Sequence, residues 1–206
     1  MIVLRKLTTP VEWLTAVPLY PCLGLIKSMP FSVDTARILS EPLVQAFFQD
    51  TVGEWRSERR YYTLKSGETQ AVVSQIKIDF LTAGDPRLLQ LAEMHGLDAN
   101  KPLICGTTVA WESDYVGTGK KPVVGSTVFG VRGTTLYRDR GFATTKPVTA
   151  EYLFRDNRTM VLKTQYNNSC FEEEIKLIGQ RYRTRQTIIS RAGEEIMIGQ
   201  YLETRC

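Results

Sequence analysis

Hydrophobic and polar residues alternate with a period of two along most of this 206-residue chain. The alternation is clearest from Glu54 to Leu64 and from Thr69 to Phe80, on either side of a Ser66-Gly67 pair. Such alternation is typical of strands with one buried face, and a Ser-Gly pair between two such runs is typical of a turn. The pattern therefore predicts an antiparallel β-hairpin.

Two other segments have apolar residues at helical spacing. The first is LVQAFFQD, residues 43–50, where Pro42 suits the first turn of a helix and Thr51-Val52-Gly53 ends it. The second runs from Pro86 to His95, with Asp85 as its N-cap. The spacing thus predicts one helix before the hairpin and a second, short helix after it.

Eight further runs with strand character follow the second helix at close spacing. They are residues 103–113, 125–132, 134–139, 148–154, 160–166, 170–177, 182–191 and 195–203. Together with the hairpin they give ten strands with short turns, which favours a meandering closed barrel over a sheet with βαβ crossovers. The predicted fold class is all-β: a ten-stranded antiparallel barrel with an N-terminal helix and one further short helix.

The N-terminal segment differs from the rest of the chain. Its apolar run, residues 11–26, is interrupted by Glu12, Pro18 and Pro21, and it is too short and too broken for a membrane-spanning helix. It also lacks the small-residue cleavage site of a secretory signal. We therefore expect residues 1–31 to be an N-terminal extension, poorly ordered in the folded protein, and residues 32–206 to form a single barrel domain.

Composition narrows the range of partners without identifying one. The chain carries 26 Lys and Arg against 22 Asp and Glu, a net charge of +4. This excess suits an anionic partner but does not separate a nucleic acid from an acidic protein or a carboxylate-bearing small molecule. The four cysteines are far apart and the one histidine is His95, so we expect free thiols and no metal site.

Alternation also assigns the side chains of the first strand to one face or the other. If Trp55 points into the barrel, then Arg59 and Tyr61 do too. A buried arginine without a counter-charge is costly. Two interpretations of Arg59 remain open: it pairs with Glu173, which shares a face with apolar neighbours on a later strand, or both polar groups face a ligand cavity.

A late strand supplies three more arginines. Arg181, Arg183 and Arg185 alternate with polar neighbours and so share one face. Three arginines on one face are more often solvated than buried, so either face of this strand could line a site. In antiparallel ligand-binding barrels that begin with Gly-x-Trp, as at Gly53, a late arginine lies across the Trp ring and closes one end of the core. The pattern indicates a closed barrel with surplus arginines for an anionic ligand.

Three motifs carry a family resemblance. They are FFQDTVGEWRSERRYY at residues 47–62, VAWESD at 109–114 and SCFEEEIKLIGQRYRTRQTI at 169–188. In order and spacing they resemble the S-type phycobiliprotein lyases, the CpcS/CpeS family of cyanobacteria and some algal plastids. The chain departs from the family pattern at Ile178-Gly179-Gln180, where many relatives have an Asn-Pro-Asn turn, and at Tyr61-Tyr62, where some have histidine.

The resemblance implies a lipocalin-like or fatty-acid-binding-protein-like barrel that attaches a phycobilin, here phycocyanobilin, through a thioether to a cysteine of an apo-phycobiliprotein subunit. The phycobilin would be a bound substrate, with no prosthetic group, and the attacking cysteine would belong to the partner. We expect neither nucleic-acid binding nor membrane insertion, and a location in the cyanobacterial cytoplasm or the plastid stroma. Whether the active form is a monomer, a homodimer or a pair with a paralogue stays open.

The chemistry of a phycobilin selects the candidate site residues. Its two propionates match the forks of arginines, and its pyrrole rings can stack on aromatic side chains. The candidate bilin-binding residues are Arg59, Arg181, Arg183, Trp111, Trp55 and Tyr61. Glu173 and Glu112 are candidate catalytic acids that would donate a proton to, or hydrogen-bond, the tetrapyrrole nitrogens.

Two other function classes remain as alternatives. A non-catalytic lipocalin or fatty-acid-type carrier of an anionic apolar molecule would share the barrel, the Trp and the Arg, but it would need no partner surface. An oligonucleotide-binding barrel would use the basic strands and the nine tyrosines. Ten strands exceed the five of that fold, so this last class ranks third.

Overall fold

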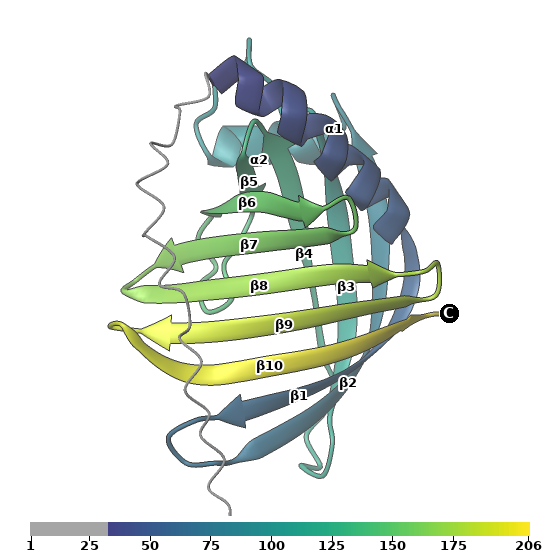
Figure 1. The fold of residues 1–206 in the computed structure, drawn as a ribbon, viewed down its shortest axis with the longest axis vertical. Helices are drawn as coiled ribbons and strands as arrows, with labels where there is room; N and C mark the ends of the chain where they lie inside the picture. Colours follow the sequence, from purple (N-terminus) through teal and green to yellow (C-terminus); the bar gives the residue numbers. More distant parts are fainter. Residues whose placement is uncertain (1–32) are drawn as a thin grey trace, which may run out of the picture. The chain divides into compact units, whose positions relative to one another are not determined.

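A computed structural model describes residues 33–206 of the chain (Figure 1). The expected N-terminal extension lies outside the described residues. Two helices and ten strands make up the described part: α1 (Val33–Thr51), β1 (Gly53–Thr63), β2 (Thr69–Thr82), α2 (Pro86–Met94), β3 (Cys105–Tyr115), β4 (Val123–Arg132), β5 (Thr135–Arg138), β6 (Val148–Asp156), β7 (Thr159–Tyr166), β8 (Ser169–Ile178), β9 (Tyr182–Arg191) and β10 (Glu194–Arg205).

The ten strands form one closed antiparallel barrel, in the order β1-β10-β9-β8-β7-β6-β5-β4-β3-β2. Each strand pairs with its neighbours in sequence, and β1 pairs with β10 to close the barrel. Every strand boundary lies within two residues of the one that the alternation predicts. The predicted fold class is confirmed.

The first helix starts earlier than its sequence pattern predicts. It begins at Val33, so Pro42 lies inside the helix and the prediction of Pro42 in its first turn is wrong. Proline removes one backbone donor, and the missing bond would have gone to the carbonyl of Ile38. Ile38 is exposed, so water can satisfy that carbonyl at little cost.

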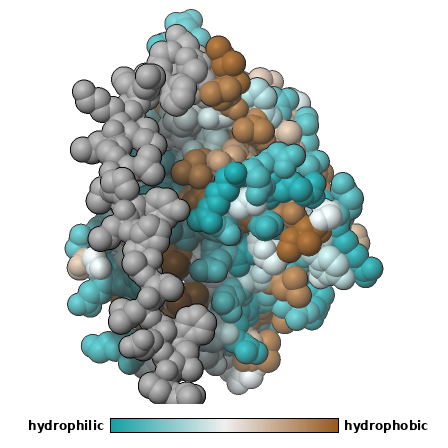
Figure 2. Space-filling view, viewed as in Figure 1, coloured by the Kyte–Doolittle hydropathy of each residue, from teal (hydrophilic) through white to brown (hydrophobic). Residues whose placement is uncertain are grey.

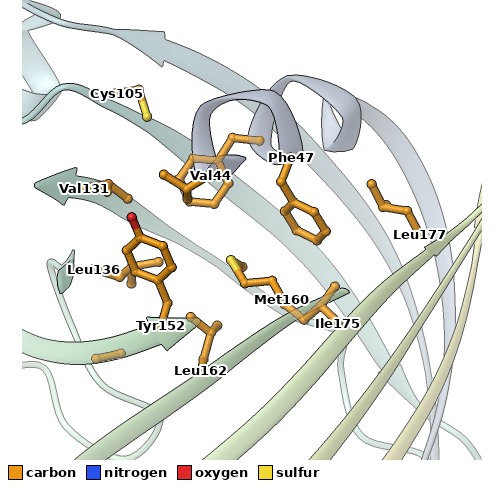
Figure 3. Close-up of a cluster of buried hydrophobic side chains, with 12 residues drawn as sticks. Val44, Phe47, Cys105, Val131, Leu136, Tyr152, Met160, Leu162, Ile175 and Leu177 are labelled. Carbon is orange, nitrogen blue, oxygen red and sulfur yellow. The ribbon is translucent and has the colours of Figure 1, made fainter. Parts of the chain in front are cut away.

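The largest buried cluster lies between α1 and the inner face of the barrel. Val44 and Phe47 of α1 point toward Met160 of β7 and Ile175 of β8 (Figure 3). The Phe47 ring packs edge-on against Phe154, with ring centroids 5.5 Å apart. Burying an apolar side chain of this size contributes about 1.5–3 kcal/mol. The apolar face of α1 therefore plugs this part of the barrel.

The outer side of α1 is apolar as well. Its exposed large hydrophobic residues are Ile38, Leu39 and Leu43. Figure 2 shows hydrophobic surface along this helix, among mostly hydrophilic neighbours. No residue of α1 lines the large cavity of the barrel, so this apolar strip and the cavity are separate features.

The second helix is capped as predicted. The Asp85 carboxylate accepts a hydrogen bond from the backbone N–H of Arg87 at 2.9 Å. The hydrogen bond from the Arg87 side chain, followed by that from its backbone, lowers the pKa of Asp85 to about 2. Leu88 and Leu91 are buried together with Leu103, which fixes α2 against the barrel.

Trp55 closes the end of the barrel where α1 turns into β1. Gly53 makes this turn with a φ of +127°, a conformation that L side chains rarely adopt. Trp55 Nε1 donates a hydrogen bond to the carbonyl of Thr51 at 2.9 Å. The guanidinium carbons of Arg205 and Arg183 lie 4.3 and 4.9 Å from the Trp55 ring. The predicted arginine across the tryptophan is confirmed, with two arginines in place of one.

Candidate functional site

A cavity of about 890 Å³ lies within the barrel. Side chains of β1, β2, β3, β4, β5, β9 and β10 form its wall, together with residues 140–145 after β5. Its volume falls in the range of about 300–1,000 Å³ that is usual for small-molecule sites. Its wall is therefore a candidate surface for binding a small molecule.

Arg59 of β1 lies in the wall, and its hydrogen-bond partners among the described residues are neutral. Its Nη2 donates to Ser113 Oγ at 3.2 Å and also to Ser74 Oγ, and its guanidinium lies 5.7 Å from the Tyr201 ring centroid. Arg59 Nε is buried without a hydrogen-bond partner. The pair between Arg59 and Glu173 that the sequence left open is contradicted. The two residues do not pair because β9 and β10 lie between β1, which carries Arg59, and β8, which carries Glu173.

Glu173 instead pairs with Arg185 on the adjacent strand. The distance between Arg185 Nη1 and Glu173 Oε1 is 3.6 Å, and the Glu173 side chain is 4% exposed. Arg185 lines the cavity, 5.5 Å from the Tyr201 ring, and its Nε is buried without a partner. Glu173 does not line the cavity itself, so Arg185 connects it to the wall.

Two tyrosines stand beside these arginines. The hydroxyl of Tyr201 donates to that of Tyr61 at 3.2 Å, and the two rings pack edge-on at 5.9 Å. Burial, and then the neighbouring Tyr61, raises the pKa of Tyr201. Its phenol therefore stays protonated at neutral pH and can donate a hydrogen bond.

Trp111 of β3 supplies a flat aromatic surface. Its ring lies over Gly125 of β4, where an added Cβ would come within 2.5 Å of Trp111 Cζ2. Alternation along β3 turns the next residue away from the cavity. Glu112 is accordingly exposed and does not line this cavity, so we do not propose it as the acid.

A further arginine in the wall was not selected from the sequence. Arg138 of β5 is 7% exposed, and its guanidinium carbon lies 4.8 Å from the Phe129 ring and 4.6 Å from the Phe142 ring. Phe142 belongs to the segment after β5 and stacks on Phe171 at 4.7 Å. Leu136, two residues before Arg138, is buried, so alternation along β5 was the available signal.

Arg183 lies outside the wall of this cavity. It forms an ion pair with Glu203, and the side chains of the two residues are 3% and 1% exposed. Ser57 Oγ donates a further hydrogen bond to Glu203 at 3.1 Å. Burial alone would raise the pKa of Glu203, but the charges of Arg183 and Arg185 hold it below its ordinary value. This buried pair stabilises the closed end of the barrel.

The structure divides the predicted bilin-binding residues into two groups. Those that line the cavity are Arg59, Tyr61 and Trp111; those that do not are Trp55, Arg181 and Arg183. Arg181 is exposed in the turn before β9, with its guanidinium 5.7 Å from the Tyr182 ring. The prediction of one common face for three arginines is therefore wrong for Arg181, because the strand begins only at Tyr182.

Other reactive groups are few in the described part of the chain. Within residues 33–206, no cluster of three or more His, Cys, Asp or Glu is placed to hold a metal ion. Neither helix of this part combines the length and apolar character needed to cross a bilayer.

Cys105, Cys170 and Cys206 are free, while Cys22 lies outside the described residues. Burial, and then the nearby Glu41, raises the pKa of the Cys105 thiol to about 12, which makes it a poor nucleophile.

Comparison with known proteins gives the same family from sequence and from structure. Residues 43–206 match the family model described as CpeS-like protein. A protein named CpcS 2 from Nostoc sp. (strain PCC 7120) is 56% identical over 169 residues, which cover 82% of this chain and 94% of the relative. The phycocyanobilin lyase subunit CpcS of Picosynechococcus sp. is 29% identical over 155 residues, which cover 71% of this chain and 78% of the relative.

A solved structure agrees with these sequence matches. The S-type phycobiliprotein lyase CPES from Guillardia theta superposes with a TM-score of 0.67 at 25% sequence identity, covering 79% of this chain and 92% of that protein. The family model, the sequence relatives and the solved structure therefore all indicate one family. The chain belongs to the CpeS-like family of chromophore lyases, as its three motifs predicted.

Proposed function

We propose that this chain binds a phycobilin inside its barrel, with phycocyanobilin as the preferred one, and attaches it through a thioether to a cysteine of an apo-phycobiliprotein subunit. The observation that carries the proposal is the cavity of about 890 Å³, whose wall combines the guanidinium groups of Arg59 and Arg185 with the aromatic rings of Trp111 and Tyr201. An open-chain tetrapyrrole has the matching chemistry, since it carries two carboxylates on flat, largely apolar rings. The choice of phycocyanobilin is supported by the name of the Picosynechococcus relative.

Arg59 is the first candidate for holding a propionate. Its partners in the barrel are hydroxyl groups, and its buried Nε has none. A charge-assisted hydrogen bond from such a group contributes about 1.5–3 kcal/mol. Trp111 and Tyr61 would then pack against the pyrrole rings and fix the orientation of the chromophore.

The attachment adds a thiol across a carbon–carbon double bond. The cysteine sulfur of the partner forms a bond to the ethylidene carbon of ring A, the double bond opens, and the adjacent ring carbon takes up a proton. The nucleophile comes from the partner. This chain would hold ring A in one orientation and keep water away from it.

Glu173 is the candidate for handling the proton. It is buried beside the cavity and is connected to the wall through Arg185, at 3.6 Å. In this position the Glu173 carboxylate either takes up the proton of the partner's thiol and passes it to the bilin after Arg185 shifts, or holds Arg185 in place for the ligand. In the free protein it pairs with Arg185.

The acceptor would be a phycobiliprotein subunit in the cytoplasm of a cyanobacterium or the stroma of a plastid. The test mixes the full-length chain with phycocyanobilin and apo-phycobiliprotein and measures bilin absorbance on the partner after acidic denaturation. We expect a coloured, acid-stable adduct, and none on a partner whose acceptor cysteine is replaced by alanine. Binding of bilin with no adduct above the rate without this chain would contradict the lyase and support the carrier.

A further inference from the structure

Arg138 is a buried cation whose side chain has no acidic partner in the described part of the chain. Its Nε is buried without a hydrogen-bond partner, and no carboxylate of residues 33–206 lies in ion-pair contact with its guanidinium. The backbone carbonyl of Arg138 is occupied, since it lies 2.9 Å from His95 Nε2. The side chain is therefore fixed in the cavity wall without an ion-pair partner among the described residues.

The nearest carboxylates are engaged elsewhere. Asp139 accepts a hydrogen bond from Thr127 Oγ1 at 2.6 Å and lies 3.4 Å from Arg140. Glu173 pairs with Arg185. Burial lowers the pKa of Arg138, and the charge of Glu173 opposes this only in part. A buried arginine in this state lacks the counter-charge that burial normally requires.

Aromatic contacts hold Arg138 but offer no hydrogen-bond acceptor. The Phe129 and Phe142 rings lie within 5 Å of its guanidinium carbon, at 4.8 and 4.6 Å. The segment that carries Phe142 is itself anchored, because the backbone N–H of Ala143 donates to the hydroxyl of Tyr166 at 2.9 Å. Packed and hydrogen-bonded neighbours therefore hold Arg138 in the cavity wall, in contrast to an arginine on a flexible surface segment.

We propose that Arg138 is a second carboxylate-binding position of the cavity, which takes a different propionate of the bilin from the one taken by Arg59. This inference rests on the proposed function. In the barrel order, β2, β3 and β4 separate β1 from β5, which amounts to four interstrand steps of about 4.8 Å each. Arg59 is held at Ser74 and Arg138 between two phenyl rings. The two positions therefore select a ligand with two separate carboxylates.

The test measures how much each arginine contributes to recognition of the carboxylates. Phycocyanobilin and its dimethyl ester are titrated by absorbance into the wild type, Arg138→Met, Arg59→Met and the double variant. We expect each single substitution to weaken diacid binding by about 10- to 100-fold. Binding of the ester should change little, and the double variant should no longer distinguish diacid from ester.

Stability without ligand separates a binding role from a structural one. Methionine removes a buried charge that has no ion-pair partner, so the melting temperature of Arg138→Met should equal or exceed that of the wild type. An unchanged preference for the diacid in Arg138→Met overturns the proposal. A large fall in melting temperature in both Arg138→Met and Arg138→Gln also overturns it, because Arg138 would then be structural. Failure of the wild type to bind the diacid rejects the proposed function, and this position with it.

Discussion

Replacing Arg183 with methionine should destabilise the barrel and leave ligand binding intact. The substitution leaves Glu203, whose side chain is 1% exposed, without its partner. Removing one member of a buried ion pair costs about 3–5 kcal/mol. In a domain of this size each kcal/mol lowers the melting temperature by about 2–4 °C, so we expect a fall of roughly 6–20 °C. Affinity for bilin should stay close to that of the wild type, because Arg183 does not line the cavity.

The pH dependence of the free energy of unfolding tests whether the unpaired Glu203 causes the loss of stability in Arg183→Met. In the wild type the pKa of Glu203 lies below its ordinary value of 4.5, so the pair contributes stability above that pH and loses it as the pH falls through the folded-state pKa. In Arg183→Met, Glu203 loses the larger of the two arginine charges that lower its pKa, so this pKa rises and protonation relieves part of the cost. The difference in free energy of unfolding between variant and wild type should therefore narrow from about pH 7 to about pH 5.

Urea unfolding followed by tryptophan fluorescence measures these differences, and a double variant provides the control. Arg183→Met combined with Glu203→Gln removes both charges and should recover most of the stability, with little dependence on pH. If Arg183→Met unfolds with wild-type free energy while its bilin affinity falls by about tenfold or more, the reasoning is refuted. Arg183 would then belong to the ligand site.

Three further predictions concern the site and the N-terminus. Arg59→Ala should weaken phycocyanobilin binding by about tenfold or more in an absorbance titration; unchanged affinity would contradict the role of Arg59 in holding a propionate. Glu173→Gln should bind bilin with a similar spectrum but form adduct on the partner at least about 10²-fold more slowly; a wild-type rate of attachment would exclude Glu173 as the acid. Deleting residues 1–28 should leave the melting temperature and adduct formation unchanged, and a clear fall in melting temperature would show that the segment packs on the domain.

Most strands of the barrel could be predicted because they are long enough to show their period. In β1 and β8, alternation places Trp55, Arg59 and Glu173 inward, and the structure agrees. The start of α1 could not be placed in the same way. Pro42 was assigned to the first turn because a proline inside a helix removes a hydrogen bond and crowds the carbonyl four residues earlier. In α1 that carbonyl belongs to the exposed Ile38, where water can reach it.

The partners of the polar groups were harder to predict than their faces. Alternation says that Arg59 and Glu173 point inward, but it does not say that two strands lie between them. Pairing depends on the order in which the barrel closes, which no local pattern carries. Arg138 was missed for a different reason: β5 has four residues, so only two positions indicate its buried face.

The seam between β1 and β10 also constrains how the chain folds as it is made. β1 ends at Thr63 and its second partner begins at Glu194, so synthesis at about 5–20 residues per second leaves one edge of β1 unpaired for roughly 7–26 s. An open strand edge invites pairing with other chains. The charged outer side chains of Arg56, Glu58 and Arg60 oppose such pairing during this interval. The seam can therefore close only after β10 has emerged, and until then the open edge of β1 must not pair with another chain.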